Sequence, residues 1–207
     1  MKLFNLPLLV IALLLPAGAG AQAPLSNGAP DVLVKSVTNE VLEIVRKDRD
    51  IQSGDRKKVL DLVEAKVLPH FDFIRMTQLA MGRDWRSAAP AQQKSLTDEF
   101  RTLLVRTYSK ALTEYKNQVI EFKPFTMKPG DTDARVRTQV MQSGAKPITL
   151  DYFLEKKPQG WKVVDIEVGG ISLVTNYRDS FASEVRSGGV DGLIKSLQAK
   201  NRSAEAK

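Results

Sequence analysis

The stretch "WKVVDIEVGGISLVTNYRDSF", Trp161–Phe181, contains the change from strand to helix on which the fold depends. Alternating apolar residues predict a strand up to the Gly169–Gly170 pair, where the chain can turn. Three of the next four residues, Ile171–Val174, are apolar, and aromatic and apolar residues spaced four apart over Tyr177–Val185 then predict a helix. The apolar residues beyond the turn are either ordinary core packing or the wall of an internal space.

Upstream of this stretch, period-two alternation predicts three more strands. The four expected strands are Ile120–Phe122, Val136–Val140, Ile148–Leu154 and Val164–Val168. The connections are rich in Gly, Pro, Lys and Asp and suit antiparallel pairing of neighbours, so the last three strands are expected to form a meander.

Apolar residues spaced three and four apart predict helices in the first half of the chain. The expected helices are 31–47 with Asp31 as its cap, 59–67 ending at Pro69, a short one within 70–82, and the longest from Pro90 to about Gln118. After the sheet and the helix that follows it, a short helix is expected in 188–198, with a frayed tail at 199–207. Helices before a sheet are typical of the α+β class, so we expect a helical layer packed on a twisted four-stranded antiparallel sheet.

The N-terminus has the three-part form of a secretory signal peptide: Lys2, an apolar run over Leu3–Leu15, and small residues that give an A-x-A cleavage match before Gln22. The run is too short to span a bilayer comfortably. We therefore expect residues 1–21 to be cleaved and residues 22–207 to form one exported domain. That length is enough for a buried core, and the absence of Cys excludes disulfides, thiol chemistry and the usual zinc sites.

The charge balance is modestly basic. Of the 31 Lys and Arg residues only Lys2 lies within residues 1–21, so the remaining chain keeps 30 against 24 Asp and Glu, a formal charge of +6. The basic residues are spread along the chain, which argues against a nucleic-acid surface. The charge then serves either a solvated surface or attraction to anionic lipid head groups or an acidic partner.

The sequence carries no motif for catalysis or cofactor binding. His70 is the only histidine, there is no G-x-S-x-G signature, and the Asp residues lack EF-hand spacing. Neither G-x-G-x-x-G nor a Walker loop is present, so no cofactor is expected. Asp165, whose neighbours Val164 and Ile166 are apolar, is either an acid of raised pKa or a strand residue that faces out or is bonded to a neighbouring strand.

The long helix and the sheet each present an apolar face. The helix offers Leu103, Leu104, Tyr108, Ala111 and Leu112, and the sheet offers Tyr152, Leu154, Val164, Ile166 and Val168. The two faces either close into a solid core or leave a ligand cavity between them, and periodicity alone allows both.

Several motifs together carry a resemblance to a known family. They are "GRDWR" at 82–86, "PAQ" at 90–92, "LLVRTY" at 103–108, "WKVVD" at 161–165 and "GISLVTNYR" at 170–178. With these motifs in this order over nearly the whole chain after the signal peptide, the sequence resembles the MlaC family, also called the toluene-tolerance auxiliary family.

The resemblance implies a phospholipid-binding protein of the periplasm that is not an enzyme and takes no cofactor. It implies lipid transport that maintains outer-membrane lipid asymmetry, with glycerophospholipid passed between an outer-membrane lipoprotein complex and an inner-membrane ABC transporter complex that has a ring-forming substrate-binding subunit. It also implies a cone like that of nuclear transport factors, with the acyl tails in a hydrophobic pocket between the layers.

The residues expected to contact lipid follow from the apolar faces and from the matching motifs. They are Leu79, Leu103, Leu104, Tyr108, Leu154, Val164, Ile166, Val168, Ile171, Leu173, Val174, Tyr177 and Arg178. For Arg178, a contact to the lipid phosphate and an ion pair on the helix surface are both open. Head-group preference, lipid number, direction of transport, docking surface and oligomeric state also stay open.

Two rival functions remain at this level. The first is an enzyme on the same cone-shaped scaffold that uses Asp165 or Tyr108 as acid or base on a small apolar substrate. The second is a ligand-free interaction module with a solid core. The enzyme needs a polar pair deep in a cavity, whereas the module needs no cavity.

Overall fold

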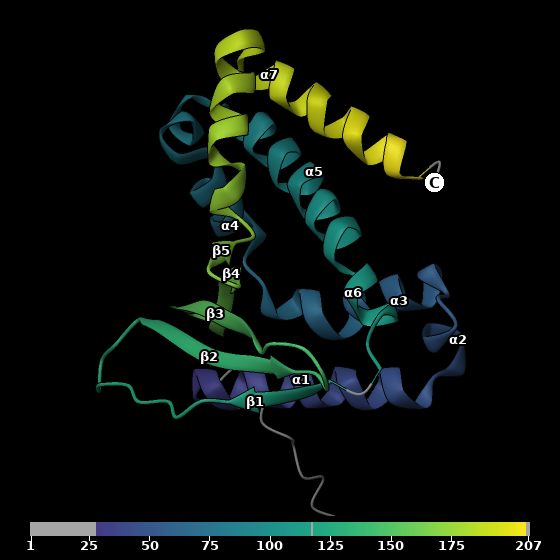
Figure 1. Ribbon diagram of the computed structural model, residues 1–207. Coiled ribbons are helices and arrows are strands. Elements are labelled where there is room, and N and C mark those ends of the chain that lie inside the picture. Colours follow the sequence, from purple (N-terminus) through teal and green to yellow (C-terminus); the bar gives the residue numbers. More distant parts are fainter. Residues whose placement is uncertain (1–27, 117, 206–207) are drawn as a thin grey trace, which may run out of the picture.

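The computed structural model describes residues 28–116 and 118–205, so the expected signal peptide lies outside the described residues. It confirms the α+β order, with most helices before an antiparallel sheet and one long helix after it (Figure 1). The helical segments are α1 (Pro30–Lys47), α2 (Arg49–Gln52), α3 (Arg56–Leu62), η2 (Val63–Val67), η3 (Leu68–His70), α4 (Phe73–Met81), η4 (Gly82–Ser87), α5 (Pro90–Tyr108), α6 (Lys110–Thr113), η5 (Thr175–Tyr177) and α7 (Arg178–Glu205).

In the described part of the chain, five strands form one antiparallel sheet in sequence order. They are β1 (Val119–Phe122), β2 (Asp133–Met141), β3 (Ile148–Lys157), β4 (Gly160–Val168) and β5 (Ile171–Ser172). The predicted count of four strands is wrong because the chain folds straight back after β4. Gly169 and Gly170 have φ values of 58° and 85°, which favour glycine and close a two-residue hairpin.

A register shift in β4 divides its apolar residues between two surfaces. Leu154 pairs with Val163, whereas Phe153 pairs with Asp165, so Val164 is an extra residue opposite this step. Directly paired residues share a face of the sheet. Val163 pairs with Leu154 and Ile166 pairs with Tyr152, and Leu154 and Tyr152 lie two apart on one face of β3, so Val163 and Ile166 face the same side. The expected single face of Val164, Ile166 and Val168 is therefore wrong at Val164.

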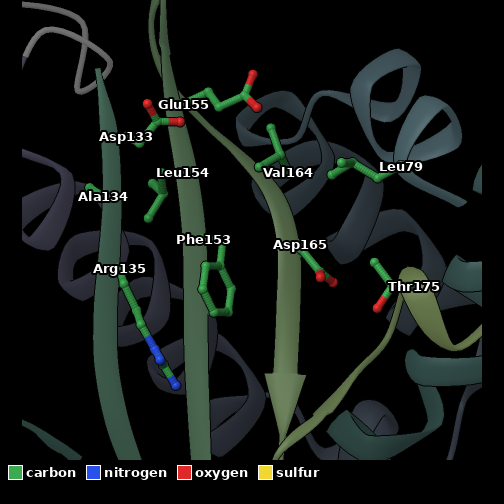
Figure 2. Close-up of a pocket in the computed structure, with 10 residues that line it drawn as sticks. All are labelled: Leu79, Asp133, Ala134, Arg135, Phe153, Leu154, Glu155, Val164, Asp165 and Thr175. Atoms are coloured by element: carbon green, nitrogen blue, oxygen red, sulfur yellow. The ribbon is translucent and has the colours of Figure 1, made fainter. Parts of the chain in front are cut away.

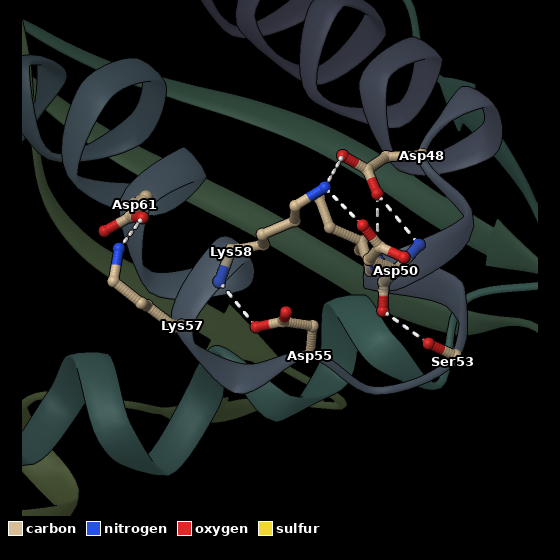
Figure 3. A network of polar contacts seen from close by, with 8 residues as sticks. Asp48, Asp50, Ser53, Asp55, Lys57, Lys58 and Asp61 are labelled. Atoms are coloured by element: carbon tan, nitrogen blue, oxygen red, sulfur yellow. Dashed lines mark hydrogen bonds and ion pairs between the residues drawn. The ribbon is translucent and has the colours of Figure 1, made fainter.

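The first residues of α1, α2 and α3 show which side chains start each helix. At α1, Pro30 occupies the first position after the N-cap Ala29, so Asp31 lies in the first turn and is not the cap as predicted. Between α1 and α3, Asp48 caps the short helix α2, and Asp55 caps α3 by accepting from the Lys58 amide (Figure 3). Caps of this kind contribute about 1 kcal/mol each.

Charged side chains reinforce the same turn. The Lys58 ammonium pairs with Asp50 and Asp48, and the Lys57 ammonium pairs with Asp61 one helical turn away (Figure 3). All of these groups are at least partly exposed, so the ion pairs add little to stability beyond the caps.

The buried apolar residues form three separate clusters rather than one. The helical cluster joins α4, α5 and α7; the sheet cluster joins α1 to β2, β3 and β4; the N-terminal cluster joins α1, α2, α3 and η2. Among the described residues, only Phe71 packs against both the helical and the sheet clusters, and only Val37 packs against both the sheet and the N-terminal clusters. A domain of this size usually has one contiguous core, so the division is a distinctive property of this fold.

The helical cluster is built around an aromatic group. Phe100 of α5 is fully buried, with edge-to-face contacts to Tyr177 at 5.2 Å and Phe181 at 5.1 Å between ring centroids. Figure 1 shows α5 and α7 side by side, at the opposite end of the molecule from β1, β2 and α1. The long helix α5 thus buries its apolar stripe chiefly against α7 and not directly against the sheet.

Within α7 the helical geometry is interrupted at Gly189, where φ is 67° and ψ is −173°. The prediction of two helices on either side of this glycine is therefore confirmed, and Figure 1 shows them at an angle to each other. The predicted fraying from 199 onward is wrong as far as Glu205, because Asn201 is buried against α5 and its side-chain amide donates to Glu99.

The kink gives a matched pair of variants. Gly189→Ala places a Cβ on a backbone conformation that is nearly exclusive to glycine, so we expect it to lower the free energy of unfolding by about 1–3 kcal/mol. Gly188→Ala, which meets nothing within 4 Å and has no positive φ, should be neutral or stabilising by up to about 1 kcal/mol. Urea unfolding of both variants tests this, and equal stabilities would show that the positive φ is not required.

Candidate functional site

A groove of about 400 Å³ lies where α4 and η5 meet the sheet (Figure 2). Its wall combines apolar and charged side chains from five elements. It is lined by Leu79 of α4, Asp133, Ala134 and Arg135 of β2, Phe153, Leu154 and Glu155 of β3, Val164 and Asp165 of β4, and Thr175 of η5. Three of the residues predicted to contact lipid, Leu79, Leu154 and Val164, therefore lie together here.

Two charged groups of the groove, Arg135 and Glu155, are paired with residues outside its lining. The Arg135 guanidinium binds the Asp151 carboxylate at 2.7 Å and lies 5.1 Å from the centre of the Phe153 ring. Glu155 accepts from Arg75 and Lys157, each at 2.7 Å. The groove therefore combines paired charged side chains with the apolar side chains of its lining.

Asp165 is the one buried carboxylate of the groove and is 8% exposed. The Ser172 hydroxyl donates to its Oδ2 atom at 2.5 Å, and the Ile166 amide donates to Oδ1. Burial raises the pKa of Asp165, and the hydrogen bond from Ser172 opposes the shift. Of the two readings open from the sequence, both apply: the pKa is raised and the side chain is bonded to the next strand.

A tyrosine pair stands close to this carboxylate, at the junction of α5 and η5. Burial raises the pKa of Tyr108 to about 12, and the Tyr177 hydroxyl, which shares a hydrogen bond with it, and the charge of Asp165 act in the same direction. General acid–base catalysis near neutral pH favours a group that titrates close to that pH, so Tyr108 is shifted away from such a role.

On the other side of the sheet, several apolar side chains are only half-buried although they belong to the interior clusters. Tyr152 and Ile166, which pair across β3 and β4, face α1, which contributes the half-buried Val37 to the same cluster. Burial raises the pKa of Tyr152, and a hydrogen bond with Thr38 of α1 opposes the shift. This seam between the sheet and α1 adjoins the N-terminal cluster through Val37.

The remaining predicted lipid contacts are divided among different places. Leu104 and Val174 are buried in the helical cluster, with Leu103, Tyr108 and Tyr177 half-buried at its edge. Val168 and Leu173 are half-buried beside the β4–β5 hairpin. The structure thus brings Leu79, Leu154 and Val164 to the groove, but it does not gather all the predicted residues in one pocket.

Two predicted contacts lie on the surface. Ile171 is 60% exposed, because the tight hairpin turns it outward instead of continuing the strand as an inner wall. Arg178 donates from Nε and Nη2 to the carbonyl oxygen of Leu79 at 3.2 and 2.8 Å, so it joins α7 to α4 through a backbone acceptor and not through an ion pair.

Sequence reasoning missed two groups of candidate residues. The first is a half-buried set at the edge of the N-terminal cluster: Val37, Ile44, Val67, Leu68 and Val105. Most of these positions follow the same three-and-four spacing that predicted the helices, but the expected cavity was assigned to the face between the long helix and the sheet. The second group, Arg135 and Phe153 in the groove, lies on the strand face opposite the apolar alternation.

With this geometry in place, comparison with known proteins identifies the family. A family model described as MlaC protein matches residues 35–199. The chain belongs to the MlaC family.

Individual relatives agree with this assignment. The chain is 21% identical over 192 residues to the intermembrane phospholipid transport system binding protein MlaC of Haemophilus influenzae, with 91% of this chain and 90% of the relative covered. It is 26% identical over 163 residues to the toluene tolerance protein ttg2D of Pseudomonas putida, covering 78% and 75% of the two chains.

A solved structure is closer in sequence. The phospholipid-binding protein of Ralstonia solanacearum, determined in complex with a phospholipid, is 43% identical, with a TM-score of 0.77 and coverage of 84% of this chain and 97% of that one. The helical layer and antiparallel sheet predicted from the sequence are therefore the arrangement found in an MlaC-family relative.

Two further features concern metal-binding groups and membrane-spanning helices. Across residues 28–116 and 118–205, no three His, Asp or Glu side chains gather in a way that could bind a metal ion. Within the same ranges, none of the helices combines the length and apolar character needed to cross a membrane.

The raised pKa of Tyr108 predicts a pH dependence. The ordinary pKa of tyrosine is about 10, so the neutral phenol's contribution to stability is complete below about pH 10 and is lost as the pH rises toward about 12. Tyr108→Phe removes this group, and its free energy of unfolding should fall less steeply than that of the wild type between about pH 10 and pH 12. Urea unfolding at several pH values measures both slopes, and parallel slopes would contradict the assignment.

Proposed function

We propose that this protein is a periplasmic carrier that encloses the acyl tails of glycerophospholipids and is not an enzyme. In this role it shuttles lipid between an outer-membrane lipoprotein complex and an inner-membrane ABC transporter complex, and so maintains the lipid asymmetry of the outer membrane. Residues 1–21 act as a cleaved signal peptide, and residues 22–207 are the single lipid-binding domain.

One observation carries the proposal. The Ralstonia solanacearum protein holds a phospholipid and shares 43% of its residues with this chain over 97% of its own length. At that similarity the clusters and the half-buried apolar seams described above are expected to recur, so the same class of ligand fits this chain.

The divided core gives a physical reason for where the tails lie. Among the described residues, the three clusters share only Phe71 and Val37, and apolar side chains are half-buried at the cluster edges. Half-buried apolar groups in an interior gain free energy when other apolar groups cover them, at about 25 cal/mol per Å². We place the tails along the seam between the sheet and α1, with Ile166 and Tyr152 on one wall.

The groove itself is too small to be the whole site. Its volume of about 400 Å³ lies near the lower end of the range for pockets that take drug-sized ligands. Two acyl chains carry about 30 methylene groups, whose exposure to water would cost on the order of 20 kcal/mol at about 0.8 kcal/mol each. A carrier must therefore cover both tails along a longer apolar path, which requires the clusters to separate.

The same estimate explains transport without nucleotide hydrolysis at the carrier. A tail that moves from a bilayer into this protein passes between two apolar environments, so most of the hydrophobic free energy cancels. The docking partner can then decide the direction of transfer.

The enzyme reading has less support. The pKa of Tyr108 is displaced to about 12, away from proton transfer near neutral pH. Both carboxylate oxygens of Asp165 already accept hydrogen bonds, from Ser172 and from the Ile166 amide. The half-buried apolar seams also disfavour a ligand-free module with a solid core, because such a module would bury them.

A matched pair of isoleucines tests the position of the tails. Ile166→Glu places a carboxylate in the apolar seam, at a cost of several kcal/mol, so lipid affinity should fall about a hundredfold or more. Ile171→Glu, at a site already 60% exposed, should leave lipid occupancy unchanged. Native mass spectrometry of each mature protein purified without detergent gives the occupancy directly.

Solvent extraction and lipid identification complete this test. Circular dichroism first establishes that both variants are folded. If Ile166→Glu carried as much lipid as the wild type, the tails would lie elsewhere; if the wild type neither held nor took up phospholipid from vesicles, the carrier function itself would be wrong.

A further inference from the structure

The sheet and the helical cluster are joined on one side by a polar joint at the start of α4. The Asp72 amide donates to the Val163 carbonyl at 2.9 Å, and Phe71 forms a parallel bridge with Val163. Arg75 pairs with Glu155 at 2.7 Å, and Lys157 pairs with Asp72 at 3.2 Å. This side combines backbone pairing with ion pairs.

The other side is spanned by the strap, residues 169–177, which leads from β4 to α7. Its β5 part pairs with β4, and the Leu173 amide donates to the Ile166 carbonyl at 2.8 Å. Val174 is then fully buried in the helical cluster. The strap therefore has one end on the sheet and the other inside the helical cluster.

Ser172 is the point at which these two ends are fixed to each other. Its hydroxyl donates to Asp165 of β4 and accepts from the amides of Val174 and Thr175, at 3.2 and 2.8 Å. One oxygen atom thus connects a sheet carboxylate to the first turn of the helical segment η5–α7. Asp165 lies at the groove beside Thr175, as Figure 2 shows.

We propose that the Asp165–Ser172 contact is a latch that holds the helical cluster against the sheet and sets how fast a bound lipid leaves. This inference rests on the carrier function proposed above. The sheet is one wall of the seam that holds the tails, and the other wall, α1, is packed through the N-terminal cluster against Val105 of α5. The seam therefore widens when the sheet moves relative to the helices, which is the movement that the latch restrains. Asp165 and Ser172 are positioning residues: they act on the lipid through the strap, without touching the tails.

The environment of the Asp165–Ser172 hydrogen bond lowers the cost of breaking it. Burial disfavours the charge of Asp165, as its raised pKa reflects, so the carboxylate gains hydration when the strap lifts. Nearby, Tyr108 at the end of α5 shares a hydrogen bond with Tyr177 in the strap. Movement of the strap would therefore also release the end of α5.

The test measures transfer of a pyrene-labelled phosphatidylethanolamine from the loaded protein to vesicles of phosphatidylethanolamine and phosphatidylglycerol. Ser172→Ala should transfer about tenfold faster than the wild type, the rate equivalent of one hydrogen bond to a charged group. Ser187→Ala is the matched control, because its hydroxyl donates to the Ser183 carbonyl on the exposed surface of α7, away from the strap, and its rate should equal that of the wild type.

A double-mutant cycle separates a latch from general destabilisation. If Asp165 and Ser172 act through one bond, Asp165→Ala is also faster, and the double variant is no faster than the faster single variant. Independent structural damage would instead make the two accelerations multiply, which would overturn the latch.

The outcomes also distinguish the two proposals. Equal transfer rates for the wild type and a loaded Ser172→Ala protein would refute the latch and leave the carrier function intact. A wild type that loads no phospholipid would refute the carrier function, and the latch with it. Loading is measured by native mass spectrometry before each transfer experiment.

Discussion

One extra residue in β4 organises the sheet and everything attached to it. Because Val164 breaks the alternation, Val163 and Ile166 face α1, while Asp165 turns to the groove on the opposite surface. The pairing is regular from Asp165 to Val168, so this stretch and the tight hairpin after it bring Asp165 within reach of Ser172. The bulge before Asp165 keeps Val163 on the same face as Ile166, so a single strand serves the sheet cluster and the strap at once.

The division of the core follows from the same arrangement. Helix α5 buries Phe100 against α7, and α1 buries Leu33 and Val34 against the sheet, so each half of the molecule is stable around its own cluster. Merging the clusters would bury more apolar surface and increase stability. A chain that keeps them separate retains apolar edges that a hydrophobic ligand can cover.

The sequence was sufficient for the fold class and for most element positions, because helical and strand periodicities are local. It failed where tertiary contacts decide. Asn201 extends α7 through a tail that reads as frayed, and the β4–β5 hairpin exposes Ile171, which composition alone places inside. Leu79, Leu154 and Val164 meet in the groove, but the half-buried α1 side of the seam was missed, since spacing does not reveal which apolar face stays partly uncovered.

Most of the side-chain contacts described between the sheet and the helical cluster are polar, and this affects how easily the two layers separate. An apolar contact that opens loses its hydrophobic free energy completely, whereas an exposed ion pair or hydrogen bond exchanges its partner for water at a small net cost. The sheet meets the helical cluster through the partly exposed pairs Arg75–Glu155 and Lys157–Asp72 and through the buried Asp165–Ser172 contact. Among the described residues, Phe71 is the apolar side chain that packs against both clusters. Layers joined in this way can separate and close again without unfolding either half, which a carrier that must admit and release two acyl tails requires.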